Sequence, residues 1–192
     1  MRWLALYARS RQVPVSVLAA LLAAAAVGAC ALAAADGGPL DPRFGVLLPG
    51  VVVAGTARGL TGQDPELDRT ATLRWAPRRA AHVLLIAALG TAVLAAARAG
   101  SQGPVAVGAA FRDATGLAGL AAVGAALGEG RFAWALPLAW TAVALSVPPG
   151  DGTPAQVLAW MLQPPSTTAA TCTSLVLACA GTAAYALGVR RR

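Results

Sequence analysis

Two charged residues, Arg112 and Asp113, stand side by side within residues 105–127, which are otherwise almost entirely apolar. A charge in the middle of a membrane-spanning helix costs about 2.5–3.5 kcal/mol on insertion scales, so such groups normally face protein or water. Two interpretations stay open: the pair lies near the outer membrane interface, where it snorkels or caps a broken helix, or it lines a translocation path. Successive helical positions diverge by about 100°, so the two side chains need not pair with each other.

The other residue types exclude most catalytic arrangements. The chain has no lysine, so it lacks the phosphate-binding lysine of a Walker motif and cannot hydrolyse ATP alone. Its one histidine, His82, cannot form a His-rich metal cluster, and no GxSxG segment supplies a nucleophile. His82 follows Arg79 at the predicted edge of a span, which favours an interfacial position. We therefore expect no catalytic residue, no metal and no cofactor.

Three cysteines are too few for a disulfide framework, and no CxxC spacing indicates zinc binding or redox chemistry. Cys30 lies deep in the first apolar segment, and Cys172 and Cys179 are seven residues apart on one face of the last. All three have apolar neighbours in the sequence. We expect them to fill small spaces in the core.

The composition is that of a membrane protein. Hydrophobic residues make up 57% of the 192 residues and charged residues 12%, and the mean hydropathy is +0.65. The net charge of +7 comes from arginines at the ends of apolar segments, which fits membrane topology and anionic lipid better than nucleic acid. Nucleic-acid binding is not expected. The exclusive use of arginine, with abundant Ala, Gly and Pro, is typical of high-GC bacteria and favours the inner membrane.

We predict an all-α, polytopic fold that forms a single transmembrane domain over residues 1–192. An amphipathic helix at residues 1–11 is expected in the headgroup layer, and a short re-entrant or interfacial helix at residues 155–162 on the outer face. The arginines of residues 58–79 and 190–192 place both termini in the cytoplasm. Six spans are expected at about residues 13–35, 40–57, 80–98, 105–127, 132–147 and 167–189.

The main polar stretch of the chain, residues 58–79, connects the second and third spans. Asp64, Pro65 and Glu66 have the pattern of an N-cap, a proline at the first helical position and a first-turn acid. A short helix is therefore predicted to begin there, and it should stop before Pro77.

Two stretches are similar to those of small high-GC bacterial permeases. One is Pro65-Glu-Leu-Asp-Arg69-Thr-Ala71, followed by Pro77-Arg-Arg79 and His82; the other is Phe111-Arg-Asp-Ala-Thr-Gly-Leu-Ala-Gly-Leu120, followed by Ala133-Trp134 and Pro137. Together with the order of elements, from interfacial helix through two spans, a cytoplasmic loop and four further spans, they resemble the transmembrane subunit of an ABC-2 type transporter. The resemblance covers the whole chain as topology.

This resemblance implies a permease subunit powered by a separate ABC ATP-binding subunit. It also implies a second permease copy or a paralogous permease as a partner in the lipid bilayer. The family's coupling helix maps onto about residues 64–75, which would present a set of charged residues to the ATPase: Asp64, Glu66, Asp68, Arg69 and Arg74. A solvated loop helix without a partner is the alternative for this segment.

The chain departs from the family pattern in its short length, its weak second span and its minimal first loop. Its main alternative function is a non-transporting membrane scaffold or a regulatory subunit of another membrane complex, which would have the same hydropathy. An intramembrane enzyme is least favoured, because acids, histidines and cysteines are not clustered.

Overall fold

The computed structural model describes residues 13–35, 42–57, 60, 75–98, 103–128, 132–148, 150 and 152–187. These ranges contain helices and turns and no β-strand, so the predicted all-α class is confirmed for them. The helices are α2 (Val13–Ala35), α3 (Pro42–Ala57), α5 (Trp75–Arg98), α6 (Gly103–Leu127), α7 (Ala135–Ser146), α8 (Thr153–Leu158), the 3-10 helix η2 (Trp160–Leu162) and α9 (Thr168–Leu187). The interfacial helix predicted at residues 1–11 lies outside the described residues.

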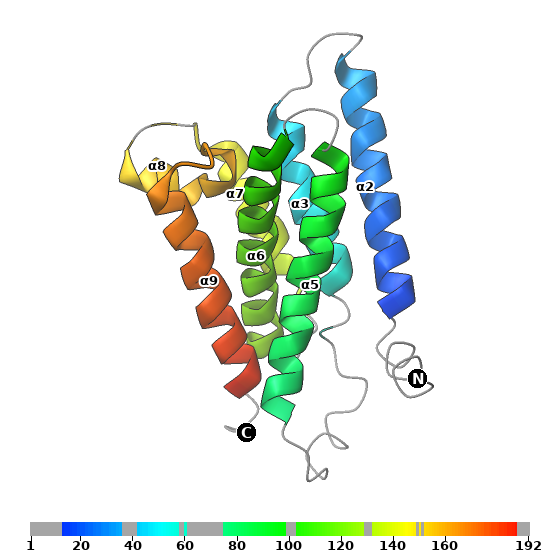
Figure 1. Cartoon of the computed structure of the whole chain (residues 1–192), viewed down its shortest axis with the longest axis vertical. Coiled ribbons are helices and arrows are strands. Elements are labelled where there is room, and N and C mark those ends of the chain that lie inside the picture. The colour runs from blue at the N-terminus through cyan, green and yellow to red at the C-terminus, as the bar shows by residue number, and fades with distance from the viewer. Residues whose placement is uncertain are drawn as a thin grey trace.

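The long helices run up and down in an antiparallel bundle (Figure 1). At one end, α2 and α5 begin and α9 ends; we call it the terminal end. The short helices α8 and η2 lie at the other end, which we call the α8 end (Figure 1). This alternation agrees with the predicted order of elements, since short connections place consecutive helices antiparallel.

The central helix of the bundle is α6, which contacts α3, α5, α7 and α9. Between Ala110 and Ala125 its side chains are buried, except for Phe111, which is exposed, and Thr115 and Val123, which are half-buried. A helix that is buried around its whole circumference needs small side chains where its neighbours cross it. The repeated Ala and Gly of α6 meet this need.

The closest helix contact joins α6 to α9 at two glycines. A Cβ added to Gly181 would overlap the carbonyl oxygen of Gly119, and one added to Gly119 would overlap the carbonyl oxygen of Leu177. Two helix backbones can approach this closely only where side chains are missing. At the edge of the bundle, α2 packs on α3 in a similar way, because a Cβ on Gly55 would lie 3.2 Å from the Cα of Ala20.

Most helix boundaries lie within two or three residues of the prediction. The third helix differs, since α5 begins at Trp75 and not at residue 80, so the last five residues of the predicted loop belong to it. Proline is tolerated in the first turn of a helix, where its missing N–H has no helical acceptor, so Pro77 does not delay the start. The helix α3 continues through Pro49.

Two helical segments, Ala76–Ala96 and Thr168–Leu187, are long and apolar enough to span a membrane. Leu18–Ala34, Phe44–Ala57 and Ala135–Ser146 are apolar but shorter. Large apolar side chains are exposed on the outer helices of the bundle, among them Leu22, Leu84 and Val176.

The cysteines lie on the outer surface, so the prediction that they fill the core is wrong. Cys30, Cys172 and Cys179 are all exposed. Cys172 and Cys179 do share one face of α9, as their spacing predicts, but that face also carries the exposed Leu175 and Val176. Apolar neighbours in the sequence do not distinguish the inner from the outer face of a helix that is apolar all round.

Candidate functional site

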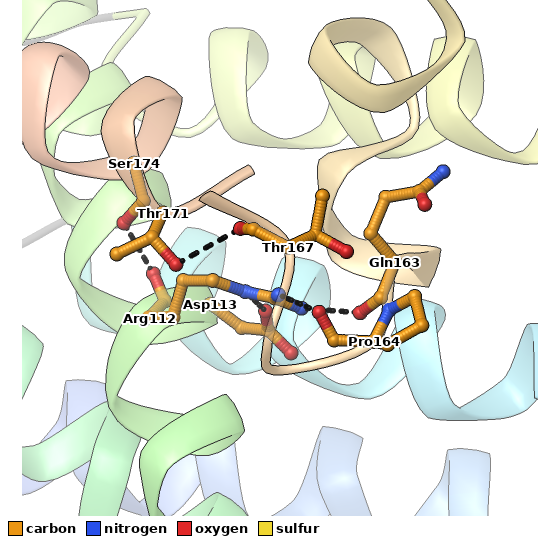
Figure 2. A network of polar contacts seen from close by, with 7 residues as sticks. All are labelled: Arg112, Asp113, Gln163, Pro164, Thr167, Thr171 and Ser174. Carbon is orange, nitrogen blue, oxygen red and sulfur yellow. Dashed lines mark hydrogen bonds and ion pairs between the residues drawn. The ribbon is translucent and has the colours of Figure 1, made fainter. Parts of the chain in front are cut away.

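The predicted candidates Arg112 and Asp113 are both buried in the third turn of α6, with 6% and 1% of their surface exposed. Arg112 donates from Nη1 to the carbonyl oxygen of Pro164 at 3.1 Å and from Nη2 to that of Gln163 at 3.0 Å (Figure 2). Its Nε donates to Oδ1 of Asp113 at 3.3 Å. The guanidinium group thus joins α6 to the turn that follows η2.

The two neighbouring side chains form an ion pair, although their positions on the helix diverge. The long Arg112 side chain brings its Nε to the carboxylate while its two terminal nitrogens reach the turn (Figure 2). A buried ion pair is tolerated only where further hydrogen bonds compensate for the loss of water. Here the two carbonyl oxygens do so.

The sequence explains why these carbonyls need a donor. Pro164 and Pro165 come after Gln163, the C-cap of η2, and lack backbone N–H groups, so the chain cannot continue in helical hydrogen bonding after Gln163. The carbonyls at the end of a helix must be satisfied by side chains, water or turns. Arg112, with five donors in a planar fork, donates to two adjacent ones, and the Pro164 carbonyl also accepts from the backbone N–H of Thr167 at 3.0 Å.

Side chains from α9 and η2 complete this contact. Ser174 Oγ donates to the carbonyl oxygen of Arg112 at 2.6 Å, and Thr171 Oγ1 donates to that of Thr167 at 3.2 Å (Figure 2). Trp160, which is fully buried, lies against Gly116, where a Cβ would be 2.6 Å from its Cη2 atom. We call Arg112, Asp113, Gln163, Pro164 and Ser174 the arginine clip.

Three buried polar atoms close to the clip in the sequence have no hydrogen-bond partner within the described part of the chain. They are Thr115 Oγ1, Trp160 Nε1 and Gln163 Nε2. An unsatisfied buried donor costs about 1–3 kcal/mol unless water reaches it. Polar groups in need of partners are therefore concentrated in the α8 half of the molecule.

A second polar contact, which the sequence did not predict, lies at the terminal end. Tyr185, in the last turn of α9, donates from its hydroxyl to the carbonyl oxygen of Leu60 at 2.8 Å. The guanidinium carbon of Arg79, on α5, lies 5.6 Å from the centroid of the Tyr185 ring, which is cation–π distance. The signal in the sequence is an aromatic residue with a polar tip two residues before the end of the last helix.

The predicted coupling residues Asp64, Glu66, Asp68, Arg69 and Arg74 lie outside the described residues. Both ends of their segment are described, since Leu60 precedes it and α5 follows it. His82 is half-buried in the second turn of α5. Within the described ranges, no group of three His, Cys, Asp or Glu side chains is placed to hold a metal ion.

Fold and site together define an all-helical bundle with a buried arginine clip near one end and two helical segments long and apolar enough to cross a membrane. Comparisons of the chain with models of protein families, with curated proteins and with solved structures find no match.

Proposed function

We propose that this chain is an integral membrane protein in which α2, α3, α5, α6, α7 and α9 all cross the bilayer. The support is the distribution of charge over the molecule. Of the side chains that the structure describes, the charged ones are Arg78 and Arg79, at the start of α5, and Arg112 and Asp113, which are buried. The described outer surface between the two ends is thus uncharged and carries large apolar side chains, which is the surface that a hydrocarbon core requires.

The hydroxyl groups support the same proposal. Thr91, Thr141, Ser146 and Thr173 each donate to the carbonyl oxygen four residues earlier in their own helix, at 2.7–2.8 Å. This back-bonding satisfies a hydroxyl without water and without a second helix. In lipid each polar group must be satisfied inside the protein, so the pattern fits a bundle that is surrounded by acyl chains.

Within this class we propose a permease subunit of an ABC transporter, located in a bacterial inner membrane with both termini in the cytoplasm. A separate ATP-binding subunit would dock on residues 58–79, and a second permease copy would complete the path. The observation that supports the proposal is the position of described residues at the two ends of this segment: Leu60 and Arg79 both contact Tyr185 in the last turn of α9, at the terminal end (Figure 1). An ATPase docked there would lie at the end of the bundle where α2 begins and α9 ends (Figure 1).

The arginine clip favours a second candidate, a non-transporting scaffold or regulatory subunit. Arg112 donates to Asp113 and to two backbone carbonyls of the same chain, and each of these bonds fastens the fold. A residue used in this way acts as a structural clamp in this conformation. A permease would have to open the clip or route its substrate elsewhere, whereas a scaffold keeps it closed.

Affinity purification of the tagged chain from its native membrane in mild detergent, followed by mass spectrometry and an ATPase assay, separates these functions. If the chain is a permease subunit, a Walker-motif ATPase should copurify with it, and the triple substitution D64N/E66Q/D68N should release that ATPase. The control is Thr173→Val, which removes a hydroxyl within α9 and leaves the docking segment intact. A chain that emerges without an ATPase, or with another membrane complex that survives the triple substitution, would establish the scaffold.

A further inference from the structure

The two ends of the segment between α3 and α5 meet at one side chain of the last helix. Leu60, just after α3, is 2% exposed and accepts the Tyr185 hydrogen bond through its carbonyl oxygen. Arg79, in the second turn of α5, lies over the face of the same ring. Tyr185 is itself 9% exposed, so both contacts form away from bulk solvent. One residue therefore contacts both ends of this segment from a third helix.

We propose that Tyr185 is a positioning residue that holds the two ends of the α3–α5 segment in register and links them to α9. The hydroxyl fixes the end of α3 by a directional bond to a backbone atom, which a side-chain rotation on α3 cannot release. The ring holds the start of α5 through the Arg79 cation. The two interactions use different parts of Tyr185, so they can be removed one at a time.

The link extends from the terminal end toward the arginine clip. Tyr185 and Ser174 lie on α9 eleven residues apart, or roughly 16 Å at 1.5 Å per residue, and Ser174 donates to Arg112 of α6. Between them, Gly181 lies directly against Gly119 of α6. Because the two backbones touch without intervening side chains, a shift of the segment ends that moves α9 would be passed on to α6 and so reach the clip. This path is independent of whether an ATPase is the docked partner.

Limited trypsin digestion of the purified full-length chain in liposomes tests the proposal, since trypsin cleaves after arginine and Arg58, Arg69 and Arg74 lie in or beside the segment. Tyr185→Phe keeps the ring and removes only the bond to Leu60. We expect it to increase the cleavage rate in this segment about two- to tenfold, the opening expected from the loss of one buried hydrogen bond. The matched control, Thr173→Val, loses a hydroxyl of the same helix that bonds only within α9, and should be cleaved at the wild-type rate.

Arg79→Gln provides a second, independent variant, because it removes the cation and leaves the Leu60 bond in place. The rate of cleavage of R79Q after Arg58, Arg69 and Arg74 should also rise. The unfolding temperatures of all variants are measured in parallel to separate this effect from a general loss of stability. Wild-type cleavage rates in both Y185F and R79Q would overturn the proposal. So would an equal rise in T173V, because the effect would then follow general stability and not the position of the segment ends.

Discussion

The glycine contact between α6 and α9 makes a quantitative prediction for Gly119→Ala. The new Cβ would overlap the carbonyl oxygen of Leu177 and lie 2.6 Å from the Cα of Ala178, about 0.8 Å short of the 3.4 Å at which ordinary contact begins. Both atoms belong to the backbone of α9, so no rotamer change relieves the overlap. The two helices must move apart by about 1 Å, and overpacking of this kind costs about 1–3 kcal/mol.

A glycine on the same helix supplies the control. Gly108 is exposed, and a Cβ added there meets nothing within 4 Å. Replacement of a helical glycine by alanine stabilises a helix by about 1 kcal/mol when the space is open. We therefore expect G119A to unfold more easily than G108A by about 2 kcal/mol or more, although the chemical change is identical.

Equilibrium unfolding in mixed detergent micelles, followed by circular dichroism, measures the difference. Wild type, G108A and G119A are compared in the same titration, and Gly181→Ala is expected to behave as G119A does, because its Cβ would overlap the carbonyl oxygen of Gly119. Equal stability of G108A and G119A would refute the reasoning. It would mean that α6 and α9 do not touch through their backbones.

Three further outcomes are expected. Arg112→Gln leaves the Asp113 carboxylate buried beside a neutral amide and should lower the free energy of unfolding by about 3–5 kcal/mol in the same titration. Replacing both Arg112 and Asp113 by leucine should lower it less than Arg112→Gln does. A larger loss in the double variant would contradict the ion-pair account. Ser174→Ala removes the 2.6 Å bond to the Arg112 carbonyl and should cost about 0.5–1.5 kcal/mol, so wild-type stability would argue against the clip. If α9 faces lipid, Cys172 and Cys179 in sealed vesicles should resist a charged maleimide and react with it only after the chain is unfolded in denaturant, because the reactive thiolate does not form in hydrocarbon. Labelling by the charged reagent in intact vesicles would contradict the membrane proposal.

The sequence predicts the helices well because prolines and polar turns interrupt its apolar runs at regular intervals. The clearest case is the short helix before the last span, where Pro154 and Pro164 bracket a segment too short to cross a membrane, and the structure has α8 and η2 there. The predicted start of α5 is five residues late, because proline marks a helix start as readily as a helix stop. The prediction places a helix stop before Pro77, whereas Pro77 lies in the first turn of α5.

The site was predictable only in part. Their charge in an apolar segment singles out Arg112 and Asp113 but leaves an interfacial position and a translocation path open, and the acceptors of Arg112 at Gln163 and Pro164 are backbone atoms about fifty residues away. A carbonyl oxygen has no residue-type signature, so sequence patterns cannot reveal it as a partner. The same holds for Tyr185, whose acceptor is the carbonyl of Leu60.

Arg112 is synthesised well before its hydrogen-bond partners, because these lie far along the chain. The carbonyl oxygens of Gln163 and Pro164 come 51 and 52 residues after Arg112, and the Ser174 hydroxyl comes 62 residues after it. At about 5–20 residues per second, a ribosome needs roughly 3–12 s to supply them. Throughout that interval the guanidinium group of Arg112 on α6 lacks the hydrogen-bond partners that the rest of the clip provides. On the membrane proposal, a nascent chain that ends before residue 163 should therefore keep α6 in the insertion machinery or at the membrane surface, and release it into the bilayer only when α9 arrives.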